Sequence, residues 1–204
     1  MGLLSSSVSI TRYTVEGKIE SSVLETIAEG LREHRITDID NDISEKAVGW
    51  TSFETPYQPY FDDSSFVIGS HLVFSLRIDK KTVPSKIVKK HFIIEMAKQL
   101  AESGREFLSR NEKRLLKENI TDMLNQRALA TPNVYDLIWN HEESWLWFFS
   151  NQKAANEELE TLFSNSFGLT LVRLFPYTIA DLFAGLSDTD RDVLSKLSSS
   201  KFTE

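Results

Sequence analysis

Hydrophobic and polar residues alternate along the N-terminal part of the chain in a way that predicts strands around one helix. Alternation with a period of two is typical of a half-buried strand, and apolar residues at three- and four-residue steps are typical of an amphipathic helix. The first pattern occupies residues 7–15, 47–53 and 66–78, and the second occupies residues 20–34. The acidic residues 38–45 carry neither pattern, so we expect a loop there.

Two long helices are predicted next. Pro84 suits a first helical turn, because its missing N–H has no hydrogen-bond partner to lose, and the helix that it starts is expected to end near Gly104. A second helix is predicted to run to about Arg127, with Asn111 or Glu112 as its cap. Each helix has an apolar face, so we expect the two to pack together as a helical hairpin.

The C-terminal part mixes the two patterns again. Residues 134–139 and 144–149 predict a pair of strands joined by a turn, and a helix at 154–163 follows, with Gly168 as its stop signal. Beyond it we expect a strand at 169–175, a short helix at 179–186 and a final helix at 188–197 that Ser187 caps.

Trp145 and Trp147 lie two positions apart in one of these predicted strands, so both side chains belong to the same face. A pair of exposed Trp rings can stack on nucleic-acid bases. Large hydrophobic side chains in a strand more often belong to the core, and we favour the core for this pair.

Charge is distributed unevenly along the chain. The formal net charge is −7, yet residues 77–127 hold 13 of the 23 basic residues against seven acidic ones. That segment therefore carries +6 and the remainder −13, which suggests a cationic interaction surface on an anionic body. Lys113, Arg114 and Lys117 emerge from adjacent turns of the second long helix, either as a solvated face or as a binding surface. Glu118 is expected to pair with Arg114.

The predicted fold is therefore α+β, with antiparallel or mixed sheet segments that flank a long basic helical hairpin. The tail is expected to fray, because chain ends are poorly ordered unless contacts hold them. We divide the chain into an N-terminal α+β part at 1–80, the hairpin at 81–130, a C-terminal α+β part at 131–197 and the tail at 198–204.

Composition narrows the class of protein. The 204 residues are 41% hydrophobic, enough to bury a core without disulfides, and the absence of Cys excludes disulfides and thiolate chemistry. No stretch approaches the roughly 18 uninterrupted apolar residues of a membrane span, and the first residues do not resemble a signal peptide. We expect a cytoplasmic protein with no membrane partner.

The motifs of several enzyme classes are absent. The eight glycines form neither GxxxxGK[ST] nor GxGxxG, and the sequence has no GxSxG, which argues against nucleotide hydrolysis and against a serine nucleophile. His91 and Glu95 lie one helical turn apart, but two ligands are too few for a dedicated metal site. We therefore predict no catalytic residue, no metal site and no cofactor.

Three segments of the basic region resemble a known family. Residues 83–89 (VPSKIVK) resemble the "LPS-x-VIK" segment of the recombination-associated RdgC family. Residues 111–118 (NEKRLLKE) and 123–128 (MLNQRA) resemble its "EK-x-x-LK-[DE]" and "LLPRAF" segments. Weaker similarities occur in the same order at Gly49–Trp50, Ile138–Trp139 and residues 166–168.

This resemblance implies a function. Members of the RdgC family are bacterial cytoplasmic or nucleoid proteins that form ring-shaped homodimers, bind duplex DNA with little sequence preference and restrain recombinase filaments. We therefore expect sequence-independent binding of double-stranded DNA, a homodimer, a recombinase or other recombination protein as a partner, and no enzymatic activity. The alternative is a protein-interaction module of the same fold that engages a recombination protein or a homologue without binding DNA.

The candidate DNA-binding residues all belong to the basic hairpin. Lys and Arg neutralise phosphates and release condensed counterions, which gives affinity without sequence information. The candidates are Lys81, Lys86, Lys89, Lys90, Arg110, Lys113, Arg114, Lys117 and Arg127.

Overall fold

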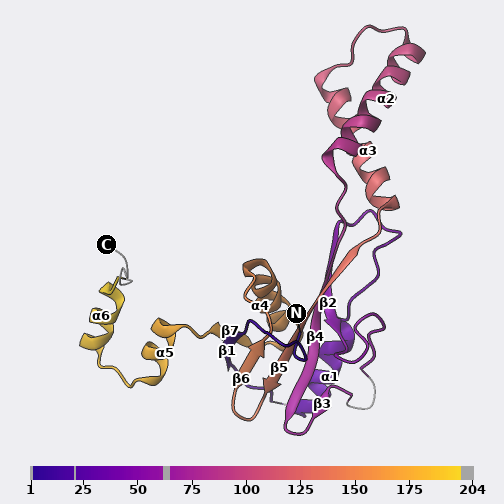
Figure 1. Cartoon of the computed structure of the whole chain (residues 1–204). Helices are drawn as coiled ribbons and strands as arrows, with labels where there is room; N and C mark the ends of the chain where they lie inside the picture. Colours follow the sequence, from indigo (N-terminus) through magenta and orange to yellow (C-terminus); the bar gives the residue numbers. More distant parts are fainter. Residues whose placement is uncertain (1, 21, 62–64, 199–204) are drawn as a thin grey trace.

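The computed structural model describes residues 2–20, 22–61 and 65–198, which form a seven-stranded antiparallel sheet with associated helices (Figure 1). The α+β class predicted from the sequence is confirmed. The strands are β1 (Thr11–Glu16), β2 (Lys46–Thr51), β3 (Val67–Ile68), β4 (His71–Lys80), β5 (Thr131–Asn140), β6 (Trp145–Phe148) and β7 (Thr170–Arg173). The described helices are α1 (Val23–Glu33), α2 (Ser85–Ser103), α3 (Arg110–Arg127), α4 (Lys153–Phe167), α5 (Pro176–Phe183) and α6 (Asp188–Lys196).

The ladder between β4 and β5 determines where the basic helices leave the sheet. The strands follow the order β2-β4-β5-β6-β1-β7, and β3 pairs with β4. Along the β4–β5 ladder the partners run from Leu72 and Trp139 at one end to Lys80 and Thr131 at the other. Because Lys80 and Thr131 are direct partners, the chain between them leaves the sheet and returns to it at the same point.

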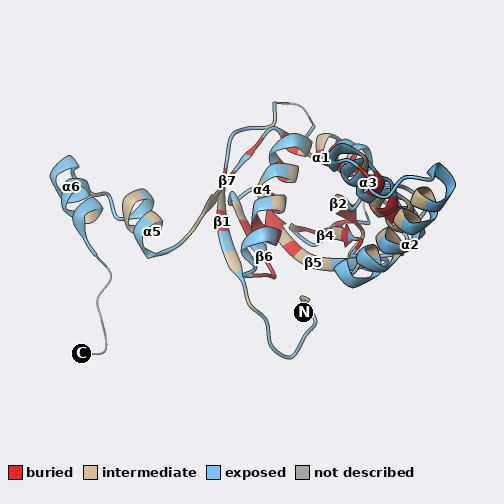
Figure 2. Ribbon diagram, turned by 90° about the horizontal axis from the view of Figure 1, so that it is seen from above, coloured by how far each residue is buried: buried red, intermediate tan, exposed pale blue. Residues whose placement is uncertain are grey.

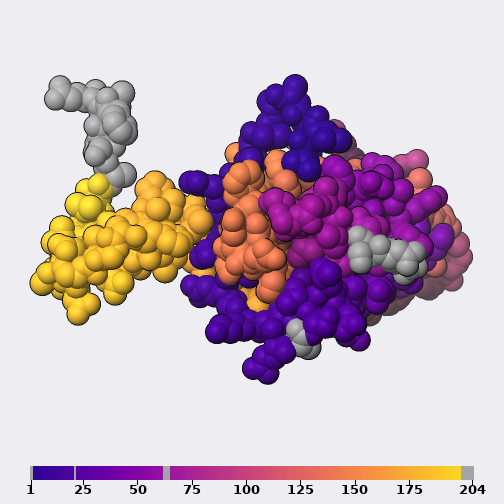
Figure 3. Space-filling view, turned by 90° about the horizontal axis from the view of Figure 1, so that it is seen from below, coloured from indigo at the N-terminus to yellow at the C-terminus, as the bar shows by residue number. Residues whose placement is uncertain are grey.

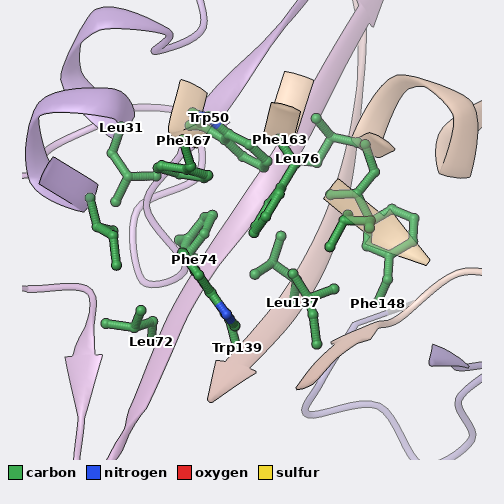
Figure 4. Packing of buried hydrophobic residues seen from close by; sticks show 14 of the residues in the cluster. Leu31, Trp50, Leu72, Phe74, Leu76, Leu137, Trp139, Phe148, Phe163 and Phe167 are labelled. Atoms are coloured by element: carbon green, nitrogen blue, oxygen red, sulfur yellow. The ribbon is translucent and has the colours of Figure 1, made fainter. Parts of the chain in front are cut away.

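Helices α1 and α4 cover one face of the sheet, and the hydrophobic core lies between them and the strands (Figure 4). The ring of Trp139 lies 4.9 Å from that of Phe163 and 5.4 Å from that of Phe167, measured between centroids. Trp50 contacts Phe74 edge to face at 5.1 Å. Each fully buried side chain of this size stabilises the fold by roughly 1.5–3 kcal/mol, so this cluster holds α4 on the sheet.

Gly49 in β2 lies where another backbone segment approaches closely. A Cβ atom at this position would be 2.5 Å from both the Cα and the backbone N of Ile36. The neighbouring Trp50 forms an isolated parallel bridge with Arg35, which places residues 35–36 against the strand. Only glycine leaves room for this contact, because backbone atoms cannot rotate away as a flexible side chain can.

The assignment of Trp145 and Trp147 to the core was wrong. Leu146 is fully buried with α4 above it, so the two Trp side chains lie on the opposite face of β6. Trp147 is 39% exposed, and the two rings lie beside each other with centroids 4.9 Å apart and planes tilted by 33°. The alternation was predicted correctly, but Leu146 and Phe148 are the residues that fill the core.

The C-terminal helices α5 and α6 extend away from the sheet (Figures 1 and 3). They contain no buried residue, and Figure 2 shows them as exposed or half-exposed along their length. Helix α5 begins three residues earlier than predicted, because Pro176 occupies its first turn. Ser187 caps α6 as predicted. Apart from Ser198, the tail predicted to fray lies outside the described residues.

Candidate nucleic-acid interface

Helices α2 and α3 pack against each other and project from the end of the sheet (Figure 1). We call residues 83–128 the arm. Leu108, Leu116 and Ile120 are buried between the helices. Val88, Phe92, Met96, Leu100 and Leu124 are partly buried against them. Because α2 has no buried residue, one face alone holds it to α3, and its other faces remain accessible.

Local sequence signals determine where the arm helices begin and end. Gly104 adopts a left-handed conformation with φ 66°, which ends α2 at the predicted position. Ser109, rather than the predicted Asn111, caps α3. Its hydroxyl accepts a hydrogen bond from the Glu112 N–H, and the Glu112 carboxylate accepts one from the Ser109 N–H, which is a capping box. The bonds from Ser109, followed by the one from Arg105, lower the pKa of Glu112 to about 2.

Replacing Ser109 by Ala is expected to lower the free energy of unfolding by about 1 kcal/mol, measured by urea denaturation, because it removes the helix cap. The pKa of Glu112 should rise toward its ordinary value of 4.5, observed by NMR titration. In the native protein this depressed pKa gives stability that is present above about pH 4.5 and is lost as the pH falls toward 2. The variant should lose part of that dependence.

Ser195→Ala is the matched control. The exposed Ser195 hydroxyl donates to the Asp192 carbonyl within α6 at 2.9 Å and accepts no hydrogen bond that the structure shows. We expect its effect on stability to remain within about 0.5 kcal/mol and the pKa of Glu112 to stay unchanged. Equal losses in both variants would contradict the cap.

Eight of the nine candidate DNA-binding residues are exposed on the arm. Arg114 donates from Nη1 to Glu118 Oε1 at 2.8 Å, so the predicted ion pair is confirmed and this charge is partly neutralised. The other seven form no ion pair with any residue that the structure describes. They are Lys86, Lys89, Lys90, Arg110, Lys113, Lys117 and Arg127.

These cations are spread along the arm and do not converge on one point. Arg110 and Arg127 are the first and last residues of α3, which at 18 residues is roughly 27 Å long. Lys89 of α2 and Lys117 of α3 line the same cleft between the two helices, so the structure brings these two together. Lys113 lies one helical turn from Lys117.

Lys81 does not belong to this exposed set, which corrects the sequence-based assignment. Only 4% of the residue is exposed. Its Nζ donates to the backbone carbonyls of Asp40 at 3.2 Å, Asp42 at 2.6 Å and Asn125 at 2.8 Å. The ammonium group therefore joins the loop after α1 to the last turn of α3, and it cannot reach a phosphate.

Lys80 is an exposed cation at the base of the arm that was not among the candidates predicted from the sequence. It ends β4 opposite Lys46 of β2, whose ammonium group pairs with Glu158. Lys80 forms no ion pair with the described residues. Alternation at the end of the strand supplied the signal, because one of two consecutive Lys residues faces inward and the other outward.

The described residues contain no group of three or more His, Asp or Glu side chains that could hold a metal ion. His91 and Glu95 of α2 line a small cleft between α2 and α3, as a pair without a third ligand among the described residues. None of the described helices has the length and apolar character needed to cross a membrane.

The sheet and the cationic arm define an α+β protein whose accessible positive charge is concentrated on a projecting pair of helices. The family model described as "Putative exonuclease, RdgC" matches residues 8–181, which include the whole sheet and the whole arm. The chain therefore belongs to the RdgC family. The search of curated proteins found no match to this chain.

Proposed function

We propose that this protein binds double-stranded DNA through its arm without sequence preference, and that it modulates recombination or replication by occupying DNA. The observation that carries the proposal is the set of seven exposed cations on the arm that pair with no described residue, in an otherwise acidic protein. The family description names an enzyme class whose substrate is nucleic acid, which supports a nucleic-acid ligand. The proposal places the protein with nucleoid DNA in the bacterial cytoplasm.

The spacing of charges on the arm suits a duplex. DNA carries one negative charge per about 1.7 Å of helix axis, so α3, roughly 27 Å long, meets phosphates in any register. Flexible Lys and Arg side chains then neutralise phosphates and release counterions. Phosphate contacts fix position but read no bases, so we propose occupancy of DNA without sequence recognition and without hydrolysis.

Fluorescence anisotropy of a labelled duplex across a salt series tests this function. We expect binding at low salt with a log–log salt slope of about −4 or steeper, because each neutralised phosphate contributes about 0.9. Unlabelled duplexes of unrelated sequence should compete equally, and the DNA should remain intact with added Mg²⁺ or Mn²⁺. Absence of binding at low salt would overturn the proposal.

We also propose a homodimer with contacts along the outer half of the arm. Apolar side chains are exposed midway along α2 at Ile93 and Ile94 and nearer the far end at Phe107 and Leu115, with Phe107 75% exposed. A second copy that covers these side chains would remove this apolar surface from water. Sedimentation equilibrium measures the mass of the assembly, and a monomer at micromolar concentration would contradict the dimer.

A further inference from the structure

A cleft of about 540 Å³ lies between α2 and α3 beside the base of the arm. Its lining includes the apolar residues Val83, Val88 and Phe92, with Lys89, Lys117 and Thr121 around them. Clefts of several hundred Å³ that are mostly apolar and carry a few polar groups are typical ligand sites. The combination of an apolar lining and two ammonium groups indicates what kind of ligand fits.

Duplex DNA uses only part of this chemistry. A phosphate pairs with an ammonium group, but it gains nothing from Val88 or Phe92. The residues that line the cleft include two cations and no carboxylate. By contrast, the smaller cleft that His91 lines also includes Glu95. The first cleft therefore favours a ligand with both negative charge and an apolar group.

We infer that this cleft binds an acidic peptide segment of a partner protein, and that one large apolar side chain of the segment occupies the space lined by Val88 and Phe92. Carboxylates on either side of that side chain pair with Lys89 and Lys117, as charge-assisted hydrogen bonds between ammonium and carboxylate. The peptide site goes beyond DNA binding. Because the peptide and duplex DNA both contact Lys89 and Lys117, they exclude each other. Only this competition rests on the proposed function.

The probe is a fluorescein-labelled hexapeptide with one Phe among five Asp residues, measured by anisotropy without DNA at about 150 mM salt, where exposed charges are screened beyond about 8 Å. Two matched peptides separate the apolar contact of the Phe side chain from the ion pairs of the Asp carboxylates. One has Ala in place of Phe, and the other has Asn in place of every Asp. We expect saturable binding of the first peptide and at least tenfold weaker binding of both others.

Thr121→Trp tests the location of the site, because the indole fills the cleft and leaves both lysines in place. Thr161→Trp on α4 is the matched control. Each Thr hydroxyl donates to the carbonyl four residues before it, at 2.9 Å, and neither makes another hydrogen bond that the structure shows. We expect Thr121→Trp to lower peptide affinity at least tenfold and Thr161→Trp to leave it unchanged.

Lys89→Gln with Lys117→Gln is a second test that does not depend on the fit of a Trp side chain, and it should also lower peptide affinity at least tenfold. Equal binding of the Phe and Ala peptides, or unchanged affinity in either variant, would overturn the inference.

Helix α6 carries Asp188, Asp190 and Asp192 beside the exposed Val193, so α6 of a second copy is the competing occupant. Failure to bind the peptide, together with a Thr121→Trp variant that becomes monomeric, would assign the cleft to that contact and overturn the partner peptide.

Discussion

Replacing Lys89, Lys113 and Lys117 together by Glu is expected to lower the affinity for duplex DNA at least about 100-fold at low salt, because three phosphate contacts become repulsive. All three side chains are exposed and form no ion pair within the described part of the chain, whereas Arg114 is already paired with Glu118, so Arg114 is left unchanged. The magnitude of the salt slope should fall by about 3, one unit for each lost contact. Anisotropy across a salt series measures both quantities.

A control with the same change in net charge separates local contacts from overall repulsion. Arg12, Lys18 and Lys196 are exposed on other parts of the molecule and form no ion pair with the described residues, and their replacement by Glu alters the net charge equally. We expect a loss of affinity of less than about tenfold in this control, with the salt slope preserved, because distant exposed charges are screened. Equal losses in the two triple variants would show that the arm has no special role.

Much of the fold follows from patterns that are local in sequence. The strand predicted at 66–78 corresponds to β3 and β4, which a turn at Gly69, with φ 63°, separates. Side chains alternate in a strand whatever its surroundings, so this pattern needs no tertiary information. The capping box of Ser109 and Glu112 was also readable from the sequence, as a Ser followed three residues later by Glu, and assigning the cap to Asn111 overlooked that signal.

Other features depend on contacts between distant segments. Which face of β6 is buried is decided by where α4 packs, and no pattern within β6 separates Leu146 from Trp147 as the core residue. Exposure of the arm cations was predictable, because α2 and α3 have only one packed face. Burial of Lys81 was not, because its acceptors come from residues 40–42 and 125, some 40 positions away on either side.

The base of the arm is held by a group of polar contacts around Lys81. Besides the three bonds from its ammonium group, the Lys81 N–H donates to the Glu45 carbonyl at 2.8 Å. The Asn125 side-chain amide donates to Glu45 Oε1 at 2.8 Å, and the Ala130 N–H donates to Asp40 Oδ1 at 2.7 Å. These bonds connect the loop after α1 to both ends of the arm, so they fix the direction in which the arm leaves the sheet.

Replacing Lys81 by Met is therefore expected to lower the free energy of unfolding by about 3 kcal/mol, measured by urea denaturation. The variant keeps most of the side-chain volume but loses three hydrogen bonds from a charged donor, each worth roughly 1.5–3 kcal/mol, and this loss is partly offset because the charge no longer has to be buried. Lys80→Met is the matched control, because Lys80 is next to Lys81 in sequence but its own ammonium group is exposed. Its effect on the free energy of unfolding should remain within about 0.5 kcal/mol.

The same two variants test whether Lys81 also orients the arm. The chain has no Cys, so the substitutions Glu102→Cys on the arm and Glu157→Cys on α4 allow spin labels to be attached at these two positions without background labelling. We expect a single narrow distance distribution in the parent protein and in Lys80→Met, and a broader one in Lys81→Met under conditions where that variant remains folded. A distribution that stays narrow in Lys81→Met would show that the packing of the helices alone sets the direction of the arm, and that Lys81 contributes only to stability.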